Sequence, residues 1–335
     1  MDSLTHIVLG ACIGEAIAGK RLGKRAMLFG AIAQNIPDID IISSLWLGPA
    51  ENLLAHRGFT HSILFAVLIT GLLAFIAKRW YQQRISLRVW MLLFGINIFV
   101  HIFIDALNAY GTGWFEPFSH QRISFHTLFV VDPLFTVWPF IAAIVLLFIV
   151  KNHRRRRFWW KIGVGLSSLY LVYAIINRVN VSVEVKHSLS KQDIPYQKLL
   201  ITPTPFNSLL WYVVAGDAQG FYIGYRSVFD TKERMDLTYF PRNDSLLSTV
   251  HDQESLQHLQ RFSQGYYTIE KWHDSLVFND LRFGQMAGWY NPNEKFIFHY
   301  FLQHPNENEL VLQRGRFAKW NEVTVKSLLK RSRGN

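Results

Sequence analysis

The chain has 335 residues, half of them hydrophobic, with a net charge of +11 and a mean hydropathy of +0.11. Such a basic chain suggests nucleic-acid binding, but its basic residues form short clusters between long apolar segments, as in membrane proteins. We therefore expect membrane lipids rather than nucleic acid as its partners. The single cysteine excludes intramolecular disulfides and cysteine-rich zinc motifs.

The apolar segments end near residue 178, which divides the chain into two predicted domains. Residues 1–178 are predicted to form an all-α, polytopic membrane domain, and residues 179–335 a soluble domain. A membrane-spanning helix needs about 20 apolar residues, and six segments approach or reach this length. They are Leu4–Gly19, Ala26–Trp46, Ser62–Ala77, Val89–Leu107, Pro133–Val150 and Trp159–Asn177.

The second of these segments is interrupted by Pro37. Proline removes a backbone hydrogen bond and ends or kinks a helix, so the regular helix is predicted over Ala26–Asn35. Broken helices are tolerated at membrane depth where they line a cavity within the protein. The break therefore marks a candidate functional region of the membrane domain.

Positive charge predicts the orientation of the helices. The loops that follow the first, third and fifth segments hold thirteen lysines and arginines, whereas the two alternate loops hold only Arg57 and Arg122. Lysine and arginine favour cytoplasmic loops. We therefore expect a multi-pass membrane protein with six crossings, and with the N-terminus, the two alternate loops and residues 179–335 outside the cytoplasm.

The second domain alternates apolar and polar residues in several stretches, a pattern typical of β-strands. The predicted strands include Leu209–Val214, Gly220–Arg226, Lys295–Phe301 and Glu309–Arg314, and Asp252–Phe262 is predicted to be a helix. We therefore expect an α+β, strand-rich extracytoplasmic domain. Its histidines show no metal-ligand spacing.

Ionisable residues gather at the predicted outer ends of the membrane helices. They are Asp2, His6, Asp38, Asp40, His56, Arg57, His61, His101 and Asp105. His101 and Asp105 are four residues apart in an apolar helix, so they share one helix face. Ionisable side chains at membrane depth are costly unless they are paired or bind an ion.

Imidazole and carboxylate groups together form a ligand set that zinc, manganese and iron bind. We predict one or two divalent ions, with zinc first and manganese or iron as alternatives. The predicted ligands are His6, Asp38, Asp40, His56, His61, His101 and Asp105. A structural interpretation stays open for some acids, because Asp2 is placed to cap the first helix and Asp38 follows a proline as in a turn.

Four motifs resemble those of the YdjM-like family of membrane-bound, metal-dependent hydrolases. They are Asp2–His6, Pro37–Asp40, His56–Ser62, and His101–Asp105 followed by Asn108, in the order usual for the family. The resemblance covers roughly residues 1–178. It implies a location in a bacterial inner membrane and a distant similarity to zinc-dependent phospholipase C, an all-helical enzyme with a multinuclear zinc site. This chain lacks a clear second HxxxE/D helix, so one or two ions are expected rather than three.

The resemblance and the position of the site favour a metal-dependent hydrolase that cleaves a phosphoester of a lipid or lipid-linked substrate. In such an enzyme Asp40 is the candidate general base and Arg57 the candidate phosphate-binding residue. Two alternatives stay open. A metal-ion or proton transporter also uses intramembrane histidine and aspartate, and a non-catalytic membrane assembly protein would bind partners through its outer domain.

Overall fold

The computed structural model describes residues 1–81, 85–303, 308 and 320–334. The chain forms two compact units, one of Met1–Ile42 with Ala55–Ala174 and the other of Ser43–Leu54 with Ile175–Asn335. The predicted strand Glu309–Arg314 lies outside the described residues.

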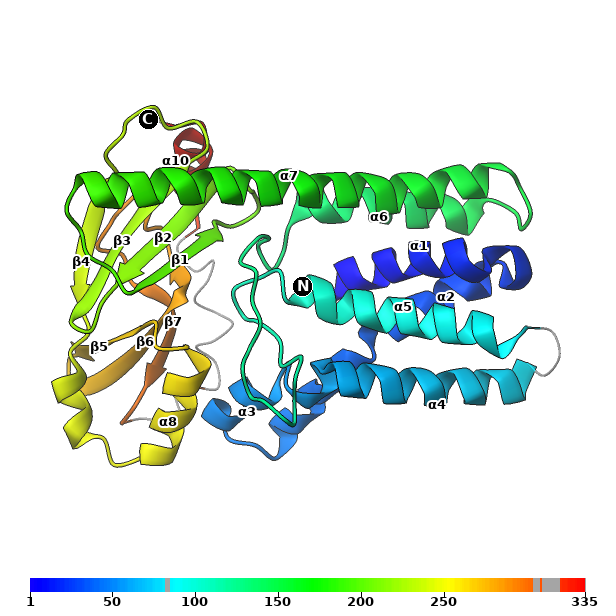
Figure 1. Cartoon of the computed structure of the whole chain (residues 1–335), viewed down its shortest axis with the longest axis horizontal. Helices are drawn as coiled ribbons and strands as arrows, with labels where there is room; N and C mark the ends of the chain where they lie inside the picture. Colours follow the sequence, from blue (N-terminus) through cyan, green and yellow to red (C-terminus); the bar gives the residue numbers. More distant parts are fainter. Residues whose placement is uncertain (82–84, 304–307, 309–319, 335) are drawn as a thin grey trace. The chain divides into compact units, whose positions relative to one another are not determined.

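The first unit is built mainly from helices that lie beside one another (Figure 1). They are α1 (Ser3–Leu22), α2 (Lys24–Asn35), α4 (Ile63–Tyr81), α5 (Leu87–Asp105), α6 (Pro133–Phe148) and the first part of α7 (Arg155–Lys191). Three short helices occur between α2 and α4, namely η1 (Pro37–Leu45), α3 (Pro49–Ala55) and η2 (Phe59–His61), of which η1 and η2 are 3-10 helices. Helix α2 ends at Asn35 as predicted, because Pro37 cannot donate to its hydrogen-bond ladder.

Three helices in the described part of the chain are long and apolar enough to cross a membrane. These are α4, α5 and α7, and α6 is a shorter apolar helix of 16 residues. They overlap the last four of the predicted segments. The helical character of this region is therefore confirmed, while the number of six crossings stays a prediction.

Helix α7 is longer than the sequence predicted. We expected it to end at Asn177, but it continues to Lys191. Val181, Val185 and Leu189 recur every four residues and are buried in one cluster with residues of β1 and β2. The prediction was wrong at this end because it followed the end of the apolar run, whereas an amphipathic stretch extends the helix.

Helices α1 and α2 pack with their backbones almost in contact. A side chain added at Gly30 of α2 would lie 2.0 Å from the carbonyl oxygen of Gly10 in α1. Glycines allow such close approach of two helices. The close crossing brings the side chain of His6 on α1 within 3.1 Å of that of Gln34 on α2.

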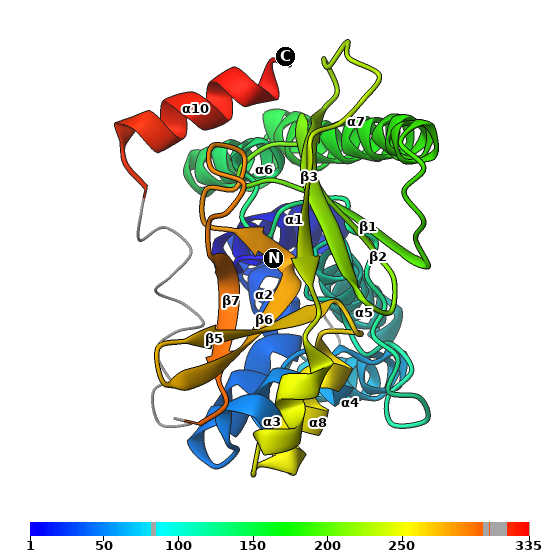
Figure 2. The same cartoon turned by 90° about the vertical axis from the view of Figure 1, so that its left-hand side faces the viewer.

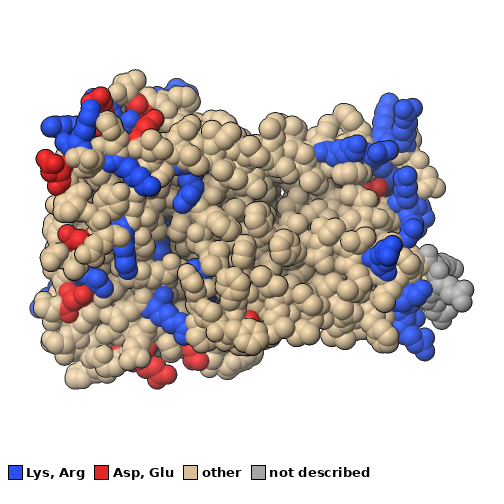
Figure 3. Space-filling view, viewed as in Figure 1, with Lys and Arg blue, Asp and Glu red and all other residues tan. Residues whose placement is uncertain are grey.

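Basic residues gather at one end of the first unit (Figure 3). Lys20 and Arg21 lie in the last turn of α1, and Lys78 and Arg79 lie in the last turn of α4. The ionisable residues singled out from the sequence lie at the other ends of the same helices, such as His6 in the first turns of α1. The two ends differ in charge in the sense that the orientation prediction requires.

The second unit contains two antiparallel sheets (Figure 2). The first sheet has the order β1 (Lys198–Pro203), β2 (Leu210–Gly216), β3 (Gly220–Ser227) and β4 (Leu237–Pro241), and the second has β5 (Tyr267–Trp272), β6 (Ser275–Gln285) and β7 (Phe296–Phe301). Among its described residues this unit also contains η4 (Asp244–Thr249), α8 (Gln253–Phe262) and α10 (Glu322–Ser332), besides most of α3 and the end of α7. Phe221, Leu281 and Leu328 share one core, which joins both sheets to α10. The predicted strand-rich character of this region is confirmed.

Candidate metal centre

Four side chains of the first unit converge on one point. They are those of Asp38, His61, His101 and Asp105, and one ligand atom of each lies within 4.8 Å of the other three. The Nε2 atoms of His61 and His101 are 3.1 Å apart, and each lies 3.5 Å from Oδ1 of Asp38. Oδ2 of Asp105 is 3.4 Å from Nε2 of His61 and 3.6 Å from Nε2 of His101.

Ends of helices supply all four side chains. His101 and Asp105 occupy the last turns of α5 at positions i and i+4, where they share one face. Asp38 follows the proline that begins η1, and His61 is the last residue of η2, just before α4. The interruption at Pro37 is therefore what places a carboxylate opposite the end of α5.

The separations between these atoms fit a divalent ion. Atoms bound about 2.0–2.2 Å from a tetrahedral ion lie roughly 3.3–3.6 Å apart, close to the distances measured here. His61, His101 and Asp105 are fully buried, and Oδ2 of Asp105 faces both imidazoles as well as Nε of Arg57, which lies 3.0 Å away. Two imidazoles and two carboxylates also form a donor set that zinc, manganese or iron accepts.

His6 lies at the edge of this four-residue cluster. Its Nε2 is 3.2 Å from Oδ1 of Asp105, and its ring stacks on that of His101 with 3.9 Å between the centroids. The side chain is fully buried. His6 therefore joins the predicted site from α1.

Asp40 and His56 lie on the far side of His61 from Asp105. Oδ2 of Asp40 accepts hydrogen bonds from the backbone N–H of Arg57 at 2.7 Å and from Oγ1 of Thr60 at 2.9 Å, and lies 3.3 Å from Nδ1 of His61. Oδ1 of Asp40 is 2.9 Å from Nδ1 of His56. Burial lowers the pKa of His56 below its usual value, although the hydrogen bond to Asp40 opposes this shift. Asp40 and His56 therefore lie beside the four converging side chains and are not among them.

Arg57 is buried and holds Asp105 from a second direction. Its Nε is 3.0 Å from Oδ2 of Asp105, and its Nη1 donates to Oδ1 of Asn108 at 3.1 Å. The guanidinium also lies over the ring of Tyr110, 5.0 Å from the centroid. The α-amino group of Met1 contacts Oδ1 of the same carboxylate. Asp105 is therefore surrounded by positively charged and donor groups.

Asp2 has the structural role that the sequence left open. It is the N-cap of α1, and its Oδ1 accepts from the backbone N–H of Thr5 at 3.0 Å. Its Oδ2 accepts from Oγ1 of Thr5 at 2.6 Å. A capping aspartate of this kind stabilises the first turn of a helix.

Two residues of the centre were missed by the sequence analysis. Gln34 contacts His6 from α2, and the guanidinium groups of Arg57 and Arg122 both lie over the ring of Tyr110. For Gln34 the available signal was an amide at the end of an apolar helix, four residues before Asp38. Tyr110 carried no comparable signal, because loop aromatics near a membrane surface are common.

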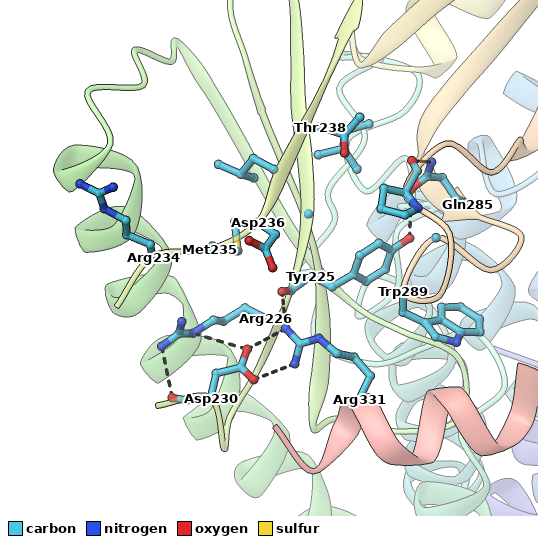
Figure 4. A pocket seen from close by; sticks show the side chains of 15 residues that line it. Tyr225, Arg226, Asp230, Arg234, Met235, Asp236, Thr238, Gln285, Trp289 and Arg331 are labelled. Carbon is cyan, nitrogen blue, oxygen red and sulfur yellow. Dashed lines mark hydrogen bonds and ion pairs between the residues drawn. The ribbon is translucent and has the colours of Figure 1, made fainter. Parts of the chain in front are cut away.

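The second unit contains a cavity of about 170 Å³ beside β3, β4 and α10 (Figure 4). Three charged residues of its lining lie together, since Arg331 forms two hydrogen bonds of 2.7 and 2.8 Å with Asp230. Asp230 also lies 3.9 Å from Nε of Arg226. Tyr225 donates its hydroxyl to Gln285 at 3.3 Å. These contacts fix α10 to the sheet and give Arg226, Asp230 and Arg331 a structural role.

Comparisons with known proteins cover the helical region and, for one relative, most of the chain. The family model described as YdjM inner membrane protein matches residues 1–181. The inner membrane protein YbcI of Escherichia coli (strain K12) is 32% identical over 121 residues, which are 36% of this chain and 69% of that protein. YfhP of Bacillus subtilis (strain 168), an uncharacterized protein, is 25% identical over 304 residues, which are 84% of this chain and 87% of that protein.

No solved structure matches the chain. The family match covers more than half of the 335 residues and includes every residue of the candidate centre. The resemblance noted on four short motifs thus extends over the whole helical region. The chain belongs to the YdjM inner membrane protein family.

Proposed function

We propose that this protein is a membrane-bound, metal-dependent hydrolase that cleaves a phosphoester of a lipid or lipid-linked substrate at the outer membrane face. The observation that carries the proposal is the buried convergence of Asp38, His61, His101 and Asp105. A divalent cation held there would supply Lewis-acid activation of water and of a phosphoryl oxygen. The centre lies at the ends of the helices away from the basic loops, which is the predicted outer side.

Within this centre the side chains differ in access to solvent. The side chain of Asp38 is 26% exposed, whereas His61, His101 and Asp105 are fully buried. We therefore infer that substrate approaches on the side of Asp38. The three buried ligands would then hold the cation from the protein side.

Exposed apolar residues lie close to Asp38 and His61 in the chain. Ile39, Ile41 and Ile42 follow Asp38 in η1, and Phe59 precedes His61 by two residues in η2. Exposed apolar side chains at the end of a membrane helix face the boundary between acyl chains and headgroups. A phosphoester at headgroup depth would then reach Asp38 while its acyl chains contact the isoleucines. This arrangement supports a lipid substrate.

The contacts of Asp40 and Arg57 favour roles different from those expected from the sequence. Asp40 already faces three donors besides His61, so we assign it to positioning His61 rather than to abstracting a proton. Arg57 contacts Asp105 and Asn108 and is only 5% exposed. We assign Arg57 to holding Asp105 in place rather than to binding a substrate phosphate.

The transport alternative has less support. A transporter needs polar groups along the membrane depth, but the part of α5 away from the centre packs Trp90, Leu93 and Phe94 into an apolar core. The buried side chains of Glu15 and Arg156 bind each other through two hydrogen bonds of 2.6 and 2.8 Å. These contacts favour a centre at one end over a path through the helices.

The test of the proposed function is hydrolysis by the full-length protein in detergent or nanodiscs. Phosphate-containing head groups should be released from phosphatidylglycerol vesicles, and p-nitrophenol from bis(p-nitrophenyl) phosphate. Both activities should disappear with a chelator and return with zinc or manganese, because the carboxylates and imidazoles need the cation to act on water. Failure of metal-replete protein to cleave either substrate would count against a phosphodiesterase.

A conservative substitution tests the assignment of Asp40. Asp40→Asn should lower metal affinity by about 10–100-fold, the usual effect of removing the partner of a metal-binding histidine. Competition with a chromophoric chelator measures this affinity. Asp274→Asn, at an exposed residue in the turn after β5, is the control and should bind metal as the wild type does. Unchanged affinity in Asp40→Asn would refute the positioning role.

A further inference from the structure

The side chain of Gln34 in the first unit directs its carbonyl oxygen at one ring nitrogen of His6. It is fully buried near the end of α2, and its Oε1 lies 3.1 Å from Nδ1 of His6. The close crossing of α1 and α2 holds it there, because its Cγ would lie 2.5 Å from a side chain added at Gly10. Gln34 therefore has little room to turn away from His6.

This contact bears on the position of the proton of His6. Oε1 of Gln34 and Oδ1 of Asp105 both only accept hydrogen bonds, whereas a neutral imidazole has one proton for its two ring nitrogens. With that proton on Nδ1, His6 donates to Gln34. Nε2 of His6 is then a lone-pair donor that faces Oδ1 of Asp105 at 3.2 Å. Two lone pairs at this distance repel each other, and a cation between them removes the repulsion.

We propose that Gln34 is a positioning residue that makes His6 a fifth metal ligand beside Asp38, His61, His101 and Asp105. Metal-binding histidines almost always donate their other N–H to a carboxylate, carbonyl or water, which fixes ring orientation and tautomer. Gln34 supplies this acceptor from α2. The inference rests on the metal site of the proposed function, but it concerns a residue to which the sequence motifs give no role.

Asp40 provides the same arrangement for His61, and this parallel strengthens the inference. Nδ1 of His61 faces Oδ2 of Asp40 at 3.3 Å, while Nε2 of His61 faces the cluster. His6 and His61 thus each present Nε2 to the centre and Nδ1 to an acceptor. Helix α1 and the short helix η2 before α4 thus each contribute a histidine with the same ring geometry.

The test compares two replacements of similar size in the full-length protein. Gln34→Glu keeps an acceptor oxygen, whereas Gln34→Leu removes it. Gln34→Leu should lower the affinity for zinc by about 10–100-fold, and Gln34→Glu should stay within about threefold of the wild type. In the cobalt-substituted protein the visible absorption of Gln34→Leu should change, because an imidazole leaves the coordination sphere, and that of Gln34→Glu should not.

A second measurement does not depend on the folding of either variant. Nitrogen-15 NMR of histidine-labelled wild-type protein loaded with zinc should show His6 protonated at Nδ1 and bound through Nε2. Finding the proton on Nε2 would overturn the inference. So would equal zinc affinity and equal cobalt spectra in wild type and Gln34→Leu, or an equal loss in both variants.

These outcomes separate the inference from the proposed function. If His61→Ala loses zinc while Gln34→Leu binds it as the wild type does, the metal centre stands and the role of Gln34 is refuted. If the wild-type protein binds no divalent metal, both proposals fail.

Discussion

Replacing His61 by alanine is expected to leave the purified protein without tightly bound metal. Its Nε2 lies within 3.5 Å of ligand atoms from Asp38, His101 and Asp105, so the change removes one corner of the donor set. The loss of affinity should exceed the roughly 100-fold that removal of a supporting residue costs. Elemental analysis of protein prepared without chelator measures metal per chain, and hydrolysis should fall with it.

Replacing Asp105 is also expected to remove the metal, and it should destabilise the folded protein more than replacing His61. Its carboxylate also contacts Arg57, His6 and the α-amino group of Met1, and removing one member of a buried ion pair costs about 3–5 kcal/mol. Asp105→Asn is therefore the better variant, because it keeps the shape of the side chain. It should lose metal and also melt at a lower temperature than His61→Ala.

His120→Ala is the matched control for the histidine. His120 is mostly exposed and pairs with Glu116 at 2.8 Å, outside the centre. Its replacement should change neither metal content nor melting temperature. Full metal occupancy in both the His61→Ala and the Asp105→Asn variant would refute the proposed metal centre.

The second large effect is expected at Gly30. A side chain there would lie 2.0 Å from the carbonyl oxygen of Gly10 and 2.9 Å from Cα of Gly14. Backbone atoms cannot move aside without separating α1 from α2, and overpacking of this kind costs about 1–3 kcal/mol or more. Gly30→Ala should therefore lower the melting temperature in detergent and weaken metal binding, because His6 and Gln34 face each other across the same crossing.

Gly71→Ala is the control for this substitution. Gly71 lies inside α4, and a side chain added there would meet open space. Alanine in a helix interior is favoured over glycine by roughly 0.5–1 kcal/mol, so this variant should melt at the same or a higher temperature. Equal melting temperatures for Gly30→Ala and Gly71→Ala would contradict the packing described here.

The sequence was sufficient where the controlling interaction is local. Pro37 ends α2 because the missing N–H acts within one helical turn, and His101 and Asp105 share a face because both lie on one helix. The alternation of apolar and polar residues predicted strands such as Gly220–Arg226 within β3. Local patterns failed at Asn177, because the helix continues on contacts with residues of β1 and β2 that the apolar run does not encode.

For the candidate site, too, the sequence determined some features and the tertiary structure determined the others. The sequence by itself determined which residue types gather at one end of the helices, since charge and hydropathy along the chain place His6, Asp38, His61 and His101 there. Only the tertiary structure decided their order around the centre. Asp40 faces away from Asp38 although the two lie in one motif, and Gln34 reaches His6 because glycines bring α1 and α2 together. Such distances depend on how helices far apart in the chain cross, and no local pattern specifies that crossing.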